Sequence, residues 1–272
     1  MTKATTTAKV ILVTGASSGI GRSCADRLHR AGWTVVGASR RGTSSAGWQP
    51  LVMDVDDDES VATGLAAVVE EHGRLDAVLA GAGWGLAGAV EQTPITDAKA
   101  QLETNFWGVV RLVQGALPVM RRQRNGRIVL VSSIGGVIGI PFQAFYSASK
   151  FAMEGYGEAL AYEVAPFGIQ VTLLQPGNVS TDFTAARRSV RSTSDGDPYG
   201  DAAAKAIGVM ERDERDGVSP ETVAAAAEKV LSVRRAPRRA SVGKLDERVG
   251  ILGKRLLPHR LFERAARGSL GV

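Results

Sequence analysis

A tyrosine and a lysine near the middle of the chain have the types and spacing needed to move a proton. Tyr146 and Lys150 stand four positions apart in "YSASK", so on a helix they share one face. An ordinary tyrosine has a pKa near 10 and is a poor base at neutral pH. An ammonium group one helical turn away stabilises the phenolate, so Lys150 is expected to lower the pKa of Tyr146. Such a pair suits general acid–base catalysis.

Two further polar residues are placed to assist this pair. Ser133 ends the apolar run "IVLVSS", 13 positions before Tyr146. Neighbouring Ser132 is the alternative, but its side chain should point to the other side of a strand. Asn105, in "LETNFWGVV", is flanked by apolar residues and is expected inside the protein, although a helical asparagine often just faces solvent.

A glycine-rich turn near the N-terminus predicts a nucleotide site. The stretch "VTGASSGIGRS" joins an apolar run to a helical pattern. Glycine there permits a tight turn, a close approach of the backbone to a pyrophosphate, and close packing of helix on strand. The free N–H groups at the helix N-terminus then bind phosphate. The residues expected at this end of the cofactor are Gly15, Ser17, Ser18, Gly19, Ile20 and Gly21.

The elements that must position these residues form an alternating pattern. Runs that are apolar throughout are typical of a parallel sheet covered on both faces. Their alternation with helical patterns predicts a Rossmann-type, doubly wound α/β fold. We expect a single domain over residues 1–272, with a polar N-terminal tail at 1–8. The expected strands are 10–16, 34–39, 50–55, 75–83, 126–133 and 169–177, and the expected helices are 22–32, 58–73, 98–123 and one that carries Tyr146.

Two later segments depart from this pattern. Residues 183–219 are polar and weakly periodic, and since they follow a strand, a substrate loop or lid is favoured over a plain surface loop. Residues 234–272 hold 11 Lys/Arg against 3 Asp/Glu, a net +8, so the remainder carries −3 of the overall +5. Charge confined to one end does not resemble a nucleic-acid groove. We expect a solvated basic extension or a subunit contact. Attachment to a membrane surface is less favoured but stays open, because Val249, Leu252, Leu256 and Leu257 have helical spacing.

The bulk composition is that of a globular protein. The 272 residues are 44% apolar, which suits a chain with a substantial core. A single cysteine, Cys24, excludes an internal disulfide and fits a reducing compartment. No run reaches 18 apolar residues and the first residues do not resemble a signal peptide, so the cytoplasm is expected. The three histidines lack metal-ligand spacing, and no metal site is predicted.

Taken together, "TGASSGIG" and "YSASK" resemble the classical short-chain dehydrogenase/reductase family over roughly residues 10–184. The sequence from "YSASK" to "STDF" is similar to the hydroxysteroid and retinol dehydrogenase subgroup. The resemblance implies an oxidoreductase that interconverts a carbonyl and a secondary alcohol. It also implies roles: Tyr146 as acid/base, Lys150 as its partner and ligand of the nicotinamide ribose, Ser133 on the substrate oxygen, and Asn105 organising a water relay.

The end of the second expected strand bears on which nicotinamide is bound. In "GASRRG", Ser39 stands where an acid would bind the ribose of NAD, and Arg40 and Arg41 follow. Guanidinium groups bind phosphate bidentately, so NADP(H) is preferred and NAD(H) is less expected, unless the arginines merely face solvent. The remaining cofactor contacts implied by the resemblance are Asp54 and Val55 at the adenine, Ala80, Gly81 and Ala82 in "AGAG" where the family has "NNAG", and Pro176, Gly177, Val179 and Thr181 near the carboxamide.

Alternatives remain for the pocket and for the function. Trp84, Phe142 and Phe145 either line an apolar substrate pocket or pack in the core. A catalytically silent NADP-binding sensor or scaffold is one rival function, and a membrane-associated steroid or retinoid dehydrogenase is another. The complete Ser/Tyr/Lys/Asn set favours the enzyme. We expect a small, apolar carbonyl or alcohol substrate and no nucleic acid, and the resemblance implies a homodimer or homotetramer.

Overall fold

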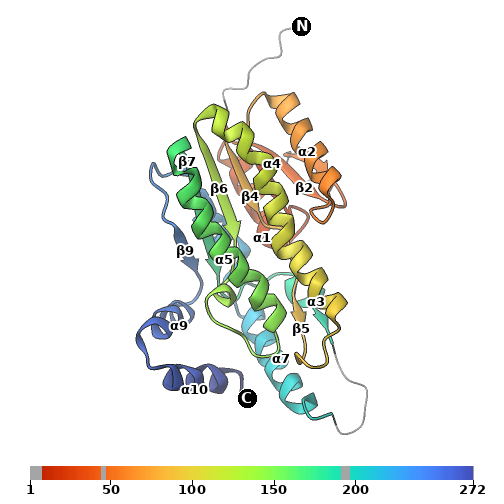
Figure 1. Cartoon of the computed structure of the whole chain (residues 1–272), viewed down its shortest axis with the longest axis vertical. Coiled ribbons are helices and arrows are strands. Elements are labelled where there is room, and N and C mark those ends of the chain that lie inside the picture. The colour runs from red at the N-terminus through yellow and green to blue at the C-terminus, as the bar shows by residue number, and fades with distance from the viewer. Residues whose placement is uncertain (1–7, 44–46, 191–196, 272) are drawn as a thin grey trace.

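The computed structural model describes residues 8–43, 47–190 and 197–271 (Figure 1). Within those ranges, seven parallel strands form one sheet in the order β3-β2-β1-β4-β6-β7-β9. The doubly wound α/β prediction is confirmed, while residues 1–7 of the expected N-terminal tail lie outside the described residues. The six predicted strands correspond to β1 (Val10–Thr14), β2 (Thr34–Ser39), β3 (Gln49–Val52), β4 (Ala77–Ala80), β6 (Gly126–Val131) and β7 (Ile169–Pro176).

Helices cover both faces of the sheet, and each face has its own apolar core. One face carries α2 (Asp58–His72), α4 (Gly108–Gln123) and α5 (Ala144–Val164). The other carries α1 (Gly19–Arg30) and α8 (Pro220–Ser232). Every residue of β1 and β4 is buried because both sides of these strands are covered, which explains their unbroken apolar sequences.

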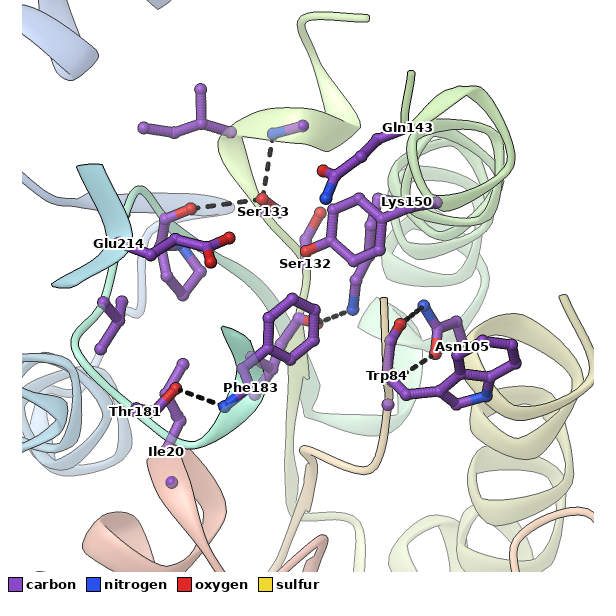
Figure 2. Close-up of a pocket in the computed structure, with 18 of the residues that line it drawn as sticks. Ile20, Trp84, Asn105, Ser132, Ser133, Gln143, Lys150, Thr181, Phe183 and Glu214 are labelled. Atoms are coloured by element: carbon purple, nitrogen blue, oxygen red, sulfur yellow. Dashed lines mark hydrogen bonds between the residues drawn. The ribbon is translucent and has the colours of Figure 1, made fainter. Parts of the chain in front are cut away.

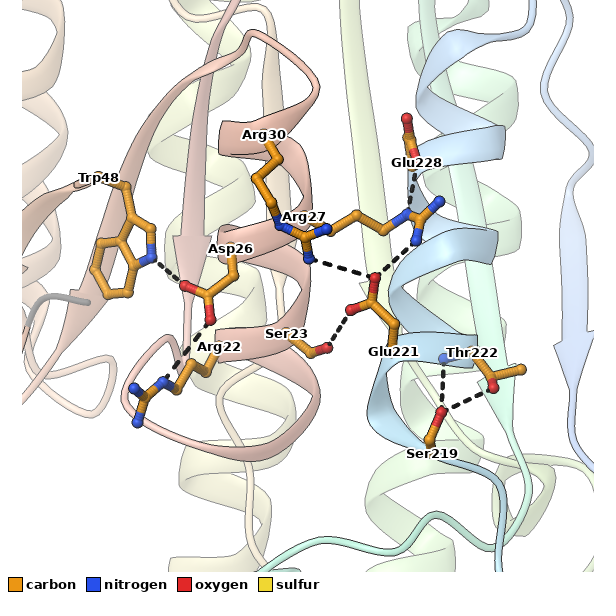
Figure 3. Close-up of polar contacts among 10 residues, drawn as sticks. All are labelled: Arg22, Ser23, Asp26, Arg27, Arg30, Trp48, Ser219, Glu221, Thr222 and Glu228. Carbon is orange, nitrogen blue, oxygen red and sulfur yellow. Dashed lines mark hydrogen bonds and ion pairs between the residues drawn. The ribbon is translucent and has the colours of Figure 1, made fainter. Parts of the chain in front are cut away.

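Polar contacts join α1 to α8 along the outer side of one helical layer (Figure 3). Arg27 of α1 donates to Glu221 at 2.7 Å and to Glu228 at 2.6 Å. Ser23 donates to the other oxygen of Glu221 at 3.0 Å. The N-cap of α8 is Ser219, whose hydroxyl accepts the backbone N–H of Thr222. These groups are partly exposed, so the contacts fix how α8 lies on α1 more than they add stability.

The basic C-terminal segment contributes a strand to the sheet, so the expectation of a solvated extension was incomplete. β9 (Arg239–Val242) pairs with β7, with Arg239 opposite Leu173. Two helices follow, α9 (Leu245–Leu256) and α10 (His259–Leu270), and α10 runs back toward α7 at the lower end of Figure 1. The sequence did not predict β9 because "RASV" is short and lacks an apolar run. It pairs only as the outermost strand of the sheet.

The segment 183–219, expected to form a substrate loop or lid, contains regular structure. It holds α6 (Phe183–Ala186), β8 (Arg188–Ser189) and α7 (Gly200–Arg215), while residues 191–196 lie outside the described residues. β8 pairs with β5 (Leu86–Ala87), which brings this segment to the end of β4. No helix in the described part of the chain is long and apolar enough to cross a bilayer.

Candidate active site

A cavity of about 1160 Å³ lies beyond the carboxyl ends of the parallel strands, where open α/β sheets bind ligands. Ala80 does not line it: this residue is 2% exposed and packs in the core of β4. The predicted contact between Ala80 and the cofactor therefore finds no support in the cavity lining, which begins at the next residue, Gly81. The predicted residues that do line the cavity are Gly15, Ser17, Ser18, Gly19, Ile20, Gly21, Ser39, Arg40, Arg41, Asp54, Val55, Gly81, Ala82, Asn105, Ser133, Tyr146, Lys150, Pro176, Gly177, Val179 and Thr181.

The turn between β1 and α1 is built so that only glycine fits at its tightest points. Gly15 has φ +73°, and a Cβ there would lie 2.7 Å from the carbonyl oxygen of Gly81. A Cβ at Gly21 would lie 2.3 Å from the carbonyl oxygen of Gly15. Ser18 precedes α1 without capping it through its side chain, so the first N–H groups of the helix stay available. This turn fits the pyrophosphate of a dinucleotide.

One end of the cavity lies where β2 stops, at the place where the sequence predicts the adenosine of the cofactor. The hydroxyl of Ser39 is buried and has no hydrogen-bond partner among the described residues. Arg41 donates to the hydroxyl of Ser17 at 3.2 Å, and Arg40 lines the same end of the cavity. Asp54 accepts the backbone N–H of Asp56 at 3.1 Å. An unpartnered hydroxyl beside two guanidinium groups fits a phosphate-bearing ligand.

At the other end of the cavity, β6 and α5 bring the proposed reacting groups together (Figure 2). Ser133 is the second residue after β6, and its hydroxyl accepts the backbone N–H of Gly135 at 3.0 Å. Tyr146 and Lys150 lie on the first turns of α5, with the Lys150 ammonium 5.8 Å from the centre of the Tyr146 ring. The Lys150 Nζ donates to the carbonyl oxygen of Val131 at 2.8 Å. The side chains of Ser133, Tyr146 and Lys150 therefore line the same cavity, as their spacing predicted.

The electrostatics of this pair differ from the sequence-based expectation. Burial raises the pKa of Tyr146, and its hydrogen bond with Ser133 only partly opposes this rise. Burial also lowers the pKa of Lys150 to about 8. The predicted lowering of the Tyr146 pKa by Lys150 is wrong for this structure, because the ammonium is directed at the Val131 carbonyl and desolvation of the phenol dominates.

Asn105 lies in a π-helical turn, Glu103–Trp107, between α3 (Ile95–Leu102) and α4. The extra residue in such a turn is often found at functional sites. The side chain is fully buried, as predicted. Its amide donates to the Trp84 carbonyl at 3.0 Å and to the Ser149 hydroxyl at 3.2 Å, and its oxygen accepts the Trp84 N–H at 3.0 Å. Asn105 thus fixes the backbone that follows β4.

Some cavity residues were missed because they come from the segment read as a loop. The Phe183 ring meets the edge of the Tyr146 ring, with centroids 5.9 Å apart. Glu214 of α7 lines the cavity, forms a buried ion pair with Arg187 and accepts a hydrogen bond from Thr184 at 2.6 Å. No periodic pattern pointed to these residues, since α7 buries few large apolar side chains.

Comparison with known proteins assigns the family. The profile of the short chain dehydrogenases matches residues 9–192. This chain belongs to the short-chain dehydrogenase family. A 3-ketodihydrosphingosine reductase of Bacteroides thetaiotaomicron is similar to this dehydrogenase at 41% identity over 260 residues, covering 95% of this chain and 97% of the relative. Retinol dehydrogenase 8 of Bos taurus is 40% identical over 190 residues, covering 64% and 60%.

Solved structures agree with this assignment. A short-chain dehydrogenase from Streptomyces avermitilis superimposes with a TM-score of 0.82 at 33% identity, covering 97% of this dehydrogenase and 98% of the other chain. The resemblance drawn from "TGASSGIG" and "YSASK" is confirmed. The chain is an oxidoreductase with an NAD(P)-binding fold.

Proposed function

We propose that this dehydrogenase prefers NADP and interconverts a ketone and a secondary alcohol, with Tyr146 as the acid/base. The observation that carries the proposal is the meeting of Ser133, Tyr146 and Lys150 in the cavity that also contains the phosphate-binding turn. A silent sensor or scaffold would not require these three groups to converge. Turnover of NADPH with a ketone tests the proposal, and tight NADPH binding with no turnover against any ketone would refute it.

Each side chain has a defined task in this reaction. The nicotinamide, when bound, supplies the hydride. Ser133 donates a hydrogen bond to the substrate oxygen, and Tyr146 gives its phenolic proton to that oxygen. Because burial keeps the pKa of Tyr146 high, the phenol is protonated at neutral pH and suits the direction of reduction. Lys150, with a pKa of about 8, is mostly an ammonium at pH 7 and is placed to bind the ribose hydroxyls.

The preference for NADP rests on Ser39, Arg40 and Arg41. β2 ends in a serine rather than an acid, so no carboxylate at that position repels a 2′-phosphate. The variant Arg40→Ser/Arg41→Ser is expected to weaken NADPH binding about 10- to 100-fold and to leave NADH binding nearly unchanged. Arg22→Ser, an exposed arginine of α1 that does not line the cavity, is the matched control. Equal losses for both cofactors would contradict the assignment.

A long-chain amphiphilic ketone is the substrate class that we propose. The relative named as a 3-ketodihydrosphingosine reductase aligns over nearly the whole chain, whereas the retinol relative covers only 64% of it. Several large apolar side chains also line the cavity, which suits an alkyl chain. NADPH oxidation with 3-ketodihydrosphingosine, a steroid ketone and retinal distinguishes the candidates. These apolar side chains include Ile138, Ile140, Phe183, Met210, Phe262 and Leu270.

We also propose a homodimer or homotetramer located in the cytoplasm. Exposed aromatic side chains at Trp107, Phe151 and Tyr162, which lie on or beside the long helices α4 and α5, support a contact between subunits. The single buried cysteine fits a reducing compartment. Sedimentation equilibrium of the wild type and of Tyr162→Asp measures the assembly.

A further inference from the structure

Helix α9 is amphipathic, but its apolar face points to solvent, whereas an ordinary surface helix packs its apolar face on the protein. Two of its polar side chains contact the protein: Glu247 accepts the backbone N–H of Asn178 at 2.8 Å, and the Lys254 ammonium donates to the carbonyl of Val137. Gly250, between them on the same face, lies against Ile138. Four apolar side chains of the helix, Leu245, Val249, Leu252 and Leu256, therefore point away from the protein, while Ile251 is partly buried.

Those outward residues form a continuous apolar stripe. They are spaced four, three and four positions apart, so they lie in one row along the helix. The row continues through the turn into α10, and these six residues are half of the exposed large hydrophobic residues in the described ranges. We call them the C-terminal stripe: Leu245 (75% exposed), Val249 (55%), Leu252 (54%), Leu256 (72%), Leu257 (43%) and Leu261 (53%).

Basic side chains surround the C-terminal stripe. From Lys244 to Arg267 the sequence holds 7 Lys/Arg and 3 Asp/Glu, a net +4. Glu247 and Lys254 are both turned toward the protein, and leaving out this pair of opposite charges keeps the net at +4. The exposed arginines on the two helices are Arg248, Arg255, Arg260, Arg264 and Arg267.

The inner side of the same helical pair lines the cavity. Phe262, Ala266 and Leu270 of α10 face the cavity, and Leu270 also packs against the buried residues of α7. A surface that covers the C-terminal stripe would therefore lie beside helices that also line the cavity. These helices lie beyond residues 9–192, the part of the chain that the family profile matches.

We propose that α9 and α10 dock on an anionic lipid surface, with the C-terminal stripe in the interface and the arginines on the headgroups. An exposed apolar row flanked by arginine is the composition that binds such surfaces. A second copy of the chain is a poorer occupant, because pairing the two stripes would bring two sets of arginines together. From the sequence alone, a solvated extension or a subunit contact was favoured over attachment to a membrane surface. Because the stripe faces outward, we now favour the membrane surface.

Co-sedimentation of the full-length protein with vesicles tests this docking without requiring turnover. The vesicles are phosphatidylcholine alone or phosphatidylcholine mixed with phosphatidylglycerol. Leu252→Asp/Leu256→Asp removes the centre of the stripe, and Arg255→Gln/Arg264→Gln removes charge. Ile95→Asp is the matched control, since Ile95 is 64% exposed and begins α3, where an acid is well tolerated. NADPH binding by every variant shows that the fold is intact.

The wild type is expected to bind the anionic vesicles and to leave them at high salt. The leucine variant should bind at least about 30-fold more weakly. The arginine variant should bind about 10- to 30-fold more weakly, and Ile95→Asp should match the wild type. The proposal is overturned if the folded wild type ignores anionic vesicles at low salt, or if the leucine variant binds as well as the wild type. A third result would also overturn it: the wild type forms a dimer and binds no vesicles, and the leucine variant no longer forms that dimer.

Discussion

Replacing Asn105 with leucine should destabilise the protein by about 3 kcal/mol and loosen the reacting end of the cavity. Leucine has the branched shape of asparagine, with somewhat larger methyl groups, but can make none of its hydrogen bonds. The side chain at this position is fully buried, so water cannot replace the lost partners. The π-helical turn around residue 105 would then hold Trp84 through fewer contacts.

The size of the effect follows from the three bonds that disappear. The partly buried Trp84 N–H loses its partner, which costs about 1–3 kcal/mol. The Trp84 carbonyl keeps the bond from Gln101 at 2.7 Å, so its loss is at the lower end of about 0.5–1.5 kcal/mol. The bond to Ser149 contributes a similar amount. An unfolding entropy of about 2.1 cal/mol/K per residue, over 272 residues, converts about 3 kcal/mol into a fall in Tm of about 5 °C.

Calorimetry of the wild type, Asn105→Leu and the exposed control Asn125→Leu measures this difference. The control should change Tm by less than about 1 °C, because Asn125 lies on the surface. Ketone turnover by Asn105→Leu should also fall, since the loosened backbone adjoins Lys150: a Cβ at Gly83 would lie 3.0 Å from Asn105 and 3.9 Å from the Lys150 ammonium. An unchanged Tm in Asn105→Leu would refute the reasoning about these three bonds.

Three further predictions concern the cofactor turn, the lysine and the buried ion pair. Gly21→Ala places a Cβ 2.3 Å from the carbonyl oxygen of Gly15. The affinity for NADPH, measured by fluorescence titration, should therefore fall at least about 100-fold. An affinity equal to that of the wild type would contradict the role of this turn. Because folding lowers the pKa of Lys150 from 10.5 to about 8, the folded state binds fewer protons between those values. The free energy of unfolding should therefore rise with pH between about 8 and 10.5, measured against Lys150→Met, and an equal slope in both proteins would argue against a buried ammonium. Glu214→Gln leaves the Arg187 guanidinium buried without its carboxylate and should cost about 3 kcal/mol in urea unfolding, while adding Arg187→Met should recover much of that loss; no recovery would argue against the pair.

The features that the sequence predicted best are those set by local geometry. Gly15 and Gly21 occupy positions where any side chain would collide with backbone, so their spacing alone identifies the turn. Tyr146 and Lys150 share a helix face whatever the rest of the fold does. The strands are buried on both faces, so their sequences are apolar without interruption.

The features that were missed depend on contacts between distant parts of the chain. β9 is a strand only because β7 offers it an edge, and α7 is stabilised by packing that "GDAAAKAIG" does not reveal. The sequence could not show that the Lys150 ammonium turns to the Val131 carbonyl, and so it gave the wrong direction for the pKa of Tyr146. Likewise, the helical spacing of Leu252 and Leu256 was visible, but not that this row faces outward.

The central claim is that Tyr146 gives its proton to a ketone in the cofactor cavity. The most direct measurement is steady-state NADPH oxidation with 3-ketodihydrosphingosine by the wild type and by Tyr146→Phe, alongside NADPH binding to both. We predict turnover by the wild type, a loss of kcat of about 100-fold or more in the variant, and NADPH affinity that is unchanged. A Tyr146→Phe protein that turns over as fast as the wild type would contradict the account.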